Sequence, residues 1–167
     1  MGSLLSCPKQ QRHRNRVNHR YSLIMMSSVL FHLAFPVTDI DQAKQFYGDR
    51  LGCSVGRSND KSVIFNLYGH QLVAHLTPEL DEPQSGIYPR HFGLVFTAEP
   101  EFDEFVQRIE TNGVSFHISP KRRFEGTVLE HRTFFLSDPF HNLMEFKHYR
   151  NPEAIFGAVD HGQVGET

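Results

Sequence analysis

Two histidines and one glutamate are the side chains of this sequence whose types and placement point to chemistry. His32 and His91 each lie at the start of a short apolar stretch, and Glu145 lies among apolar neighbours in another. Two imidazoles and one carboxylate form the set that binds Fe(II) or a similar divalent ion and leaves open positions for substrate and oxygen. A buried carboxylate without a partner would be costly, and a cation is one such partner. These residues therefore predict a divalent-metal site.

The elements that position the histidines come from an internal repeat. Leu30–Val37 and Arg90–Phe96 both have the pattern of a strand, in which the histidine shares one face with small residues and large apolar side chains occupy the other. Taken alone, either histidine is more simply a core or edge residue with a local hydrogen-bond partner. Because both occupy the same repeat position, a twofold arrangement of the halves would bring them together, and we favour the metal site.

Each of these strands precedes a helix that can cover its apolar face. The first helix begins at Thr38 or Asp39 and ends at Gly52, and the second begins at Pro100 and ends at Gly113. Each half is thus expected to be a βαβββ module, and the expected fold class is α+β with two tandem modules. The further strands that we expect are Cys53–Arg57, Ser62–Leu67, Gln71–Leu76, Val114–Ile118, Glu130–Leu136 and Leu143–His148.

Composition divides the chain into an extension, a domain and a tail. Residues 1–28 contain no acidic side chain and no apolar periodicity, so we expect a disordered N-terminal extension. Residues 29–150 form the domain, with modules at 29–77 and 90–150. Residues 151–167 form a C-terminal tail.

Charge and cysteine content limit the partners and the compartment. Five of the 17 basic side chains precede Val29, which leaves 12 against 19 acidic ones, so the domain does not suggest nucleic acid. The apolar runs are far shorter than the about 20 residues that a membrane helix needs. Cys7 and Cys53 provide neither a disulfide framework nor a thiolate metal cage. We expect a cytoplasmic protein that binds a small-molecule substrate, with no nucleic acid and no membrane as partner.

Two basic segments need separate interpretations. Residues 1–28 fit a disordered tail, an organelle-targeting peptide if the source is eukaryotic, or translated sequence upstream of a true start at Met25 or Met26. We favour the last because the folded pattern begins within a few residues of these methionines. Pro120–Gly126 is expected to be a mobile basic loop.

The segment Leu30–Tyr149 resembles the vicinal oxygen chelate superfamily, also called the glyoxalase/bleomycin resistance/extradiol dioxygenase superfamily. The resemblance lies in the repeated module, in the two histidines and in Asp138-Pro139-x-x-Asn142-x-x-Glu145, which is close to the final-strand signature of that family. It implies a cupped mixed sheet around a divalent metal, with His32, His91 and Glu145 as ligands. Members include ring-cleaving dioxygenases, glyoxalase I, epimerases, fosfomycin-modifying transferases and metal-free drug-binding proteins.

The closing strand of the first half helps to separate these activities. Enzymes similar to glyoxalase I place a second carboxylate there as ligand and base, and Gln71–His75 contains none. If Val73 corresponds to Glu145, then His75 lies two residues on and on the same face. If Ala74 corresponds to Glu145, His75 turns away. We favour the first register, because it aligns the turn residues that precede the two strands.

The first register makes His75 similar to the acid/base histidine of extradiol dioxygenases. The alternatives are that His75 is a fourth metal ligand, or that it faces outward and has no role. The extradiol signature is met only in part, since Phe135 stands in place of its tyrosine and His141 in place of its glycine or proline. The substrate therefore need not be a simple catechol.

The function expected from this resemblance is that of a non-haem Fe(II) dioxygenase, an oxidoreductase acting on a small aromatic diol or a similar chelating substrate. Mn, Ni or Zn also fit the ligand set. One alternative is a lyase or isomerase similar to glyoxalase I, using Ni or Zn, in which Glu145 moves the proton. A metal-free small-molecule-binding module is a further alternative. Whether the modules pair within one chain or across a homodimer is left open.

Overall fold

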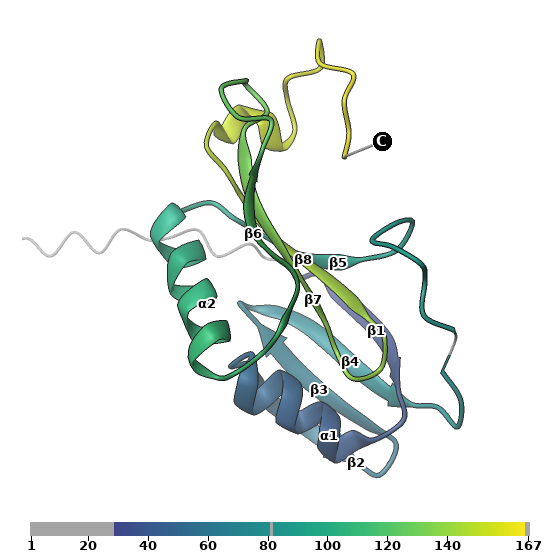
Figure 1. Ribbon diagram of the computed structural model, residues 1–167. Coiled ribbons are helices and arrows are strands. Elements are labelled where there is room, and N and C mark those ends of the chain that lie inside the picture. The colour runs from purple at the N-terminus through teal and green to yellow at the C-terminus, as the bar shows by residue number, and fades with distance from the viewer. Residues whose placement is uncertain (1–28, 81, 166–167) are drawn as a thin grey trace, which may run out of the picture.

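Two four-stranded sheets, one for each half of the chain, form the framework (Figure 1). The computed structural model describes residues 29–80 and 82–165, so the expected N-terminal extension lies outside the described residues. The first sheet has the order β1 (His32–Val37), β4 (His70–Leu76), β3 (Ser62–Leu67) and β2 (Ser54–Asn59), and the second the order β5 (Phe92–Phe96), β8 (Leu143–Tyr149), β7 (His131–Ser137) and β6 (Phe116–Arg123). In each sheet the first pair is parallel and the other pairs are antiparallel. The prediction of two tandem βαβββ modules is confirmed.

A helix follows the first strand of each module. α1 (Ile40–Ala43) is followed directly by the π-helix η1 (Lys44–Arg50), and α2 spans Glu99–Thr111. Asp39 caps α1, because its carboxylate accepts a hydrogen bond from the backbone N–H of Gln42 at 2.9 Å. The short 3₁₀ helix η2, formed by residues 152–155, follows the last strand. None of the helices in the described residues is long and apolar enough to cross a membrane.

One hydrophobic core joins the two modules. The buried cluster contains side chains from both sheets and both helices. Tyr68, in the turn between β3 and β4, contacts the rings of Phe96 and Phe105 in the second module at centroid distances of 5.3 and 5.9 Å. Phe35 of β1 lies 5.9 Å from Phe92 of β5. Because the apolar face of each sheet packs into this shared core, the histidine-bearing faces point away from it.

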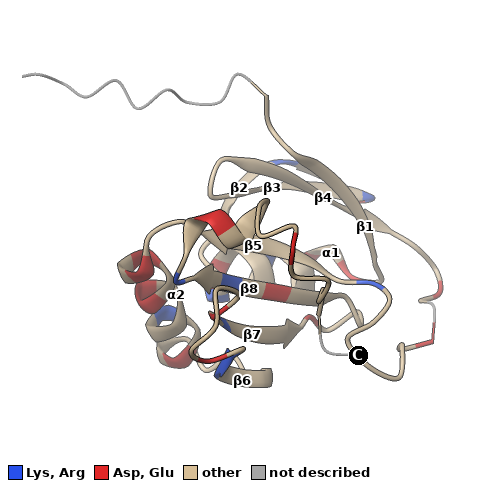
Figure 2. Cartoon of the chain, turned by 90° about the horizontal axis from the view of Figure 1, so that it is seen from above, with Lys and Arg blue, Asp and Glu red and all other residues tan. Residues whose placement is uncertain are grey.

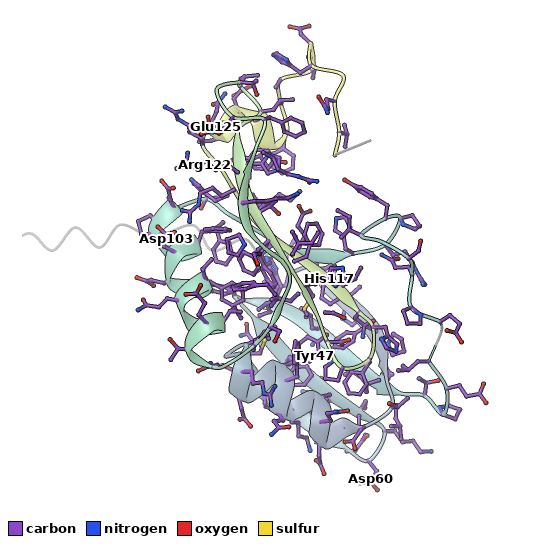
Figure 3. The ribbon with its side chains drawn as sticks, viewed as in Figure 1. Tyr47, Asp60, Asp103, His117, Arg122 and Glu125 are labelled. Atoms are coloured by element: carbon purple, nitrogen blue, oxygen red, sulfur yellow. The ribbon has the colours of Figure 1, made fainter. Side chains whose placement is uncertain are left out.

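A buried hydrogen-bonded cluster at Asp138 ties the turn before β8 to the first module. The hydroxyl of Tyr47, which is labelled in Figure 3, donates to Oδ2 of Asp138 at 2.7 Å, and the side-chain amide of Asn142 donates to the same oxygen at 2.7 Å. That amide also donates to the carbonyl of Pro36 on β1 at 3.1 Å. Burial raises the pKa of Asp138, and the hydrogen bonds from Asn142 and Tyr47 oppose the rise. The Asp-Pro-x-x-Asn segment therefore helps to hold the two modules together.

The strand β6 is longer than the sequence pattern predicts, so the expected loop over Pro120–Gly126 is wrong in its first half. The strand continues to Arg123, whose side chain is buried. The pairing of β6 with β7 shifts register between Ile118 and Lys121, and Pro120 lies at this irregularity. Proline is tolerated at such a bulge, because no ladder hydrogen bond is needed there. The bounds of the other strands differ from the predicted ones by at most two residues, and those of β3 agree.

Candidate metal centre

The parallel pair of β5 and β8 brings His91 and Glu145 together. Nε2 of His91 lies 3.2 Å from Oε2 of Glu145. Gly93 is the partner of Glu145 in the register, and His91 precedes Gly93 by two residues and shares its face. A Cβ at Gly93 would overlap the backbone carbonyl of Glu145, so the strands can approach this closely only with glycine. Two of the three predicted ligands are therefore neighbours within the described chain.

The orientation of His91 leaves a lone pair directed at the carboxylate. Nδ1 of His91 lies 2.8 Å from the carbonyl oxygen of Ile87, which can only accept, so Nδ1 carries the proton. In the neutral ring Nε2 is then an acceptor, and it faces the carboxylate of Glu145, another acceptor. A cation placed against both atoms would be stabilised by them, and Nζ of Lys147 already lies 2.8 Å from the same carboxylate oxygen. A histidine whose second nitrogen is fixed by a carbonyl is the usual form of a metal ligand.

Glu145 is a buried carboxylate with two further partners on its own sheet. The Thr133 hydroxyl donates to Oε1 at 2.8 Å, and Nζ of Lys147 lies 2.8 Å from Oε2. Burial acts to raise the pKa of Glu145, but Lys147, Thr133 and His91 outweigh it and lower this pKa. β8 contains one acidic and one basic side chain, Glu145 and Lys147, and Figure 2 draws these two residue classes in red and blue. Glu145 is thus held in the ionised form that a metal ligand needs.

His32 is oriented in the same way as His91, but by a side chain. Nδ1 of His32 lies 2.8 Å from Oε1 of Gln71, which stands beside it in the parallel register of β1 and β4. The amide oxygen only accepts, so Nδ1 carries the proton and Nε2 presents a lone pair. The side chain of His32 is exposed. Sequence reasoning missed Gln71 because the register of a parallel pair is set by the tertiary structure.

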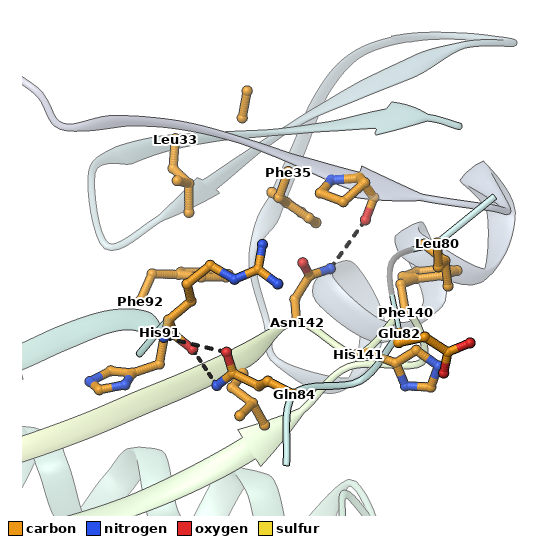
Figure 4. A pocket seen from close by; sticks show the side chains of 14 residues that line it. Leu33, Phe35, Leu80, Glu82, Gln84, His91, Phe92, Phe140, His141 and Asn142 are labelled. Atoms are coloured by element: carbon orange, nitrogen blue, oxygen red, sulfur yellow. Dashed lines mark hydrogen bonds between the residues drawn. The ribbon is translucent and has the colours of Figure 1, made fainter. Parts of the chain in front are cut away.

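The structure holds His32 apart from the other two predicted ligands within one chain. In the part of the chain that the structure describes, no three His, Cys, Asp or Glu side chains are close enough to share a metal ion. A cleft of about 260 Å³ separates β1 from β5, and Figure 4 shows Leu33 and Phe35 pointing into it while the ring of His91 is directed away. The apolar faces of the two strands therefore face each other, and the histidines lie on the outer faces.

The register of β4 supports the favoured alignment of the two modules. Val73 pairs with Ala34, two residues after His32, just as Glu145 pairs with Gly93, two residues after His91. Val73 therefore occupies the position of Glu145 in the first module. His75 is exposed and lies on the same face of β4 as Gln71, the partner of His32. A catalytic role for His75 stays a prediction.

A cavity of about 550 Å³ opens beside the His91–Glu145 pair. Its wall carries the cationic side chains of Arg123 and Lys147 and the buried imidazole of His131. Burial lowers the pKa of His131, its hydrogen bond to a backbone carbonyl opposes this, and the charges of Lys147 and Arg123 add to the lowering. An anionic small molecule would be attracted to this wall.

The C-terminal tail forms much of the remaining wall. Residues from Ala154 to Gly165 line the cavity together with Tyr88 and Tyr149. No sequence pattern predicts this placement, because the tail lacks the periodicity of a strand or a long helix. Lys147 could have been found from the sequence, since alternation along a strand places it on the same face as Glu145.

Comparisons with known proteins agree with this geometry. Residues 29–146 match the model of the Glyoxalase/Bleomycin resistance protein/Dioxygenase superfamily. A crystal structure of a glyoxalase/bleomycin resistance protein/dioxygenase from Alicyclobacillus acidocaldarius has 40% sequence identity and a TM-score of 0.73, covering 77% of this chain and 97% of that chain. Virulence protein STM3117 of Salmonella typhimurium is 27% identical over 139 residues, which are 80% of this chain and 93% of that protein. Metallothiol transferase FosB of Staphylococcus saprophyticus is 29% identical over 109 residues, which are 65% of this chain and 68% of that protein.

Proposed function

The chain belongs to the glyoxalase/bleomycin resistance protein/dioxygenase superfamily, and from this membership we propose that it is a divalent-metal-dependent enzyme acting on a small chelating substrate. The observation that carries the proposal is the approach of Nε2 of His91 to Oε2 of Glu145 at 3.2 Å, with the proton of His91 held on its other nitrogen. Two such acceptors form half of a cation site. Fe(II) is the ion that two histidines and one carboxylate favour, and Mn, Ni or Zn also fit.

The third ligand of the proposed site is His32 of a second copy of the chain. His32 is exposed, and Gln71 fixes its ring so that Nε2 is free to bind a cation. Within the described chain His32 does not join His91 and Glu145. A twofold homodimer in which the first module of one copy faces the second module of the other would complete two equivalent sites. Each site would then draw ligands from both copies.

Oxygen-dependent cleavage of a small aromatic diol is the reaction that we place first. A bound divalent ion would act as a Lewis acid on the substrate oxygens. Thr133 and Lys147 keep Glu145 ionised, and Ile87 keeps the Nε2 lone pair of His91 free. His75 lies on the same face as His32, so in the proposed dimer it approaches the site from the same wall. We assign to His75 the uptake and return of a proton from a substrate hydroxyl.

A second candidate is a reaction that needs no oxygen, namely group transfer to an anionic substrate or a lyase reaction. Its support is the cationic side chains of Arg123 and Lys147 in the cavity wall, of which Lys147 is already paired with Glu145. Phe135, which contacts the ring of His91 at 5.4 Å, supplies no hydroxyl near the site. The similarity to a metallothiol transferase favours the same candidate.

Anaerobic purification followed by elemental analysis and oxygen-uptake measurements tests the proposal. We expect one divalent ion per chain, and oxygen uptake when a panel of catechols is added to the Fe(II)-loaded protein. Turnover of a substrate that continues unchanged without oxygen would exclude the dioxygenase and leave the second candidate. A chain that binds none of these metals would contradict both.

A further inference from the structure

Lys147 lies between two hydrogen-bond acceptors on one face of the second sheet. Alternation along β8 places Glu145, Lys147 and Tyr149 on this face. His131 of β7 is opposite Tyr149 in the register, so it is diagonal to Lys147. Diagonal neighbours on adjacent strands lie about 7–8 Å apart, within reach of a long side chain. Lys147 can therefore extend back toward Glu145 or forward toward His131.

In the structure Lys147 extends toward Glu145. Its Nζ lies 2.8 Å from Oε2 of Glu145, the same oxygen that lies 3.2 Å from Nε2 of His91. A metal ion bound to this oxygen would be about 2.1 Å from it, and hence at most about 5 Å from Nζ. Two cations this close repel each other strongly where little water separates them. A divalent ion and the ammonium of Lys147 therefore compete for one carboxylate oxygen.

The second acceptor is a buried nitrogen of His131. His131 is 5% exposed, and its Nδ1 lies 2.9 Å from the carbonyl oxygen of Leu129, so Nδ1 carries the proton and Nε2 presents a lone pair. Burial lowers the pKa of His131, which favours this neutral form. Among the described residues Nε2 has no hydrogen-bond partner. A buried acceptor without a donor is costly, and an ammonium group would satisfy it.

The surroundings of His131 suit a cation that brings an anion with it. The ring of Tyr149 lies 4.8 Å from that of His131, and Nζ of Lys147 is already 5.9 Å from the Tyr149 centroid, where an aromatic face stabilises an ammonium group. Arg123 lines the same cavity of about 550 Å³, so a second cation there favours an anion in the cavity. An ammonium has three N–H donors, and after one bond to Nε2 it keeps two for such an anion.

We propose that Lys147 links metal binding to recognition of an anionic group on the substrate, an inference that rests on the metal site proposed above. Without a metal, Lys147 pairs with Glu145. When a divalent ion takes the carboxylate oxygen, the ammonium moves to Nε2 of His131 and there binds the anionic group. Metal and anion then strengthen each other's binding, because both favour the same position of Lys147. The substrate carries a negative charge in addition to the oxygens that chelate the metal.

Titration of Mn(II) into the native chain and into Lys147→Met tests the competition. At pH 8, where Thr133 and His91 still favour the ionised form of Glu145, we expect Lys147→Met to bind Mn(II) about 10- to 100-fold more tightly, since a neighbouring cation lowers proton affinity of a carboxylate by a similar factor. Lys61→Met is the control, because Lys61 is exposed in the turn between β2 and β3. Unchanged or weaker binding in Lys147→Met would overturn this inference alone. A native chain that binds no divalent ion would contradict the proposed function.

A double-mutant cycle tests the second position of Lys147. His131→Phe keeps an aromatic ring but removes the acceptor, so it should weaken Mn(II) binding by about 10-fold in the native background, as expected for loss of a hydrogen bond to a charged group. In the Lys147→Met background the same change should have no effect. In ¹⁵N spectra, Zn(II) should shift the Nε2 resonance of His131 only when Lys147 is present. Equal effects in both backgrounds would overturn the movement.

Inorganic sulfate tests the link to an anion. In the native chain, sulfate should tighten Mn(II) binding by about 5-fold or more, and Mn(II) should tighten sulfate binding by the same factor. Neither effect should occur in Lys147→Met. Coupling that persists in Lys147→Met would show that sulfate binds the metal directly, and this would overturn the role of Lys147. Absence of coupling in the native chain would overturn it as well.

Discussion

The two modules share one fold and one histidine position, yet they contribute differently to the proposed site. In the second module His91 has a buried carboxylate beside it, Glu145. In the first module the corresponding position is Val73, and His32 has only the neutral side chain of Gln71 as partner. The second module therefore offers a charged, partly enclosed half-site, and the first offers a neutral donor on an exposed face.

The difference continues two residues further along each strand. Lys147 follows Glu145 on the same face and neutralises it, with its Nζ 2.8 Å from the carboxylate. His75 occupies the corresponding place in the first module, where no carboxylate needs a partner. The repeated backbone thus places side chains at equivalent positions of the two modules. The type of side chain at each position decides which chemistry is available there.

Removal of the predicted metal ligands should have the largest effect, and the effect on metal affinity should differ between the two modules. His91→Ala and Glu145→Ala should each lower divalent-metal affinity by ~70- to 900-fold, if the ~10–16 kcal/mol of a four-ligand site is shared evenly among its ligands. His32→Ala should cause a comparable loss only under conditions where the native chain is a dimer. Isothermal titration with Mn(II) at two protein concentrations measures both effects. Full metal occupancy in His91→Ala would contradict the assignment.

Substitution of His75 should separate the proton-transfer role from a ligand role. We expect His75→Ala to keep its metal and to slow turnover by ~10²–10⁴, the usual contribution of a positioned acid or base. His117→Ala is the control, because His117 is an exposed histidine on β6 of the other module. Metal analysis and turnover should be measured on the same preparations. Loss of metal in His75→Ala would instead identify a fourth ligand.

Substitution of Gln71, the side chain that orients His32, should have an intermediate effect on metal affinity. Gln71→Leu introduces the residue that the second module has at the equivalent position, Leu143, and leaves His32 without its partner. We expect metal affinity in the dimer to fall by ~10–100-fold, as for other partners of metal-bound histidines. Gln71→Glu keeps an acceptor and should retain most of the affinity. Equal affinities of the two variants would show that Gln71 does not orient His32.

The smallest expected effect is on the stability of the fold, and it concerns the turns that precede β4 and β8. Gly69, before β4, has φ of +90°, and His141, before β8, has φ of +68°. A side chain at positive φ is strained, so His141→Gly should stabilise the fold by about 0.5–1 kcal/mol. Gly69→His should destabilise it by a similar amount. Thermal unfolding of the two variants measures both stability changes. A lower Tm for His141→Gly than for the native chain would contradict the interpretation.

Local pattern was sufficient for the two modules and for the faces of their first strands. Alternation of large and small side chains located β1 and β5 with their histidines on the small-residue face, because one face of each strand packs into the core. The close approach of β5 to β8 through Gly93 then places His91 beside Glu145. Pro120 misled the prediction of β6, because a proline at a bulge has the same local signal as a proline in a loop.

By itself the sequence determined the two βαβββ modules, the faces of their strands and the residue types available to a metal. Only the tertiary structure decided which of these residues meet. Phe35 packs against Phe92 in a shared core, and this contact turns His32 away from His91 within the described chain. The reason is physical: strand periodicity depends on neighbours in sequence, whereas the relative placement of two modules depends on which apolar surfaces pack together. Those surfaces are made by residues far apart in the chain.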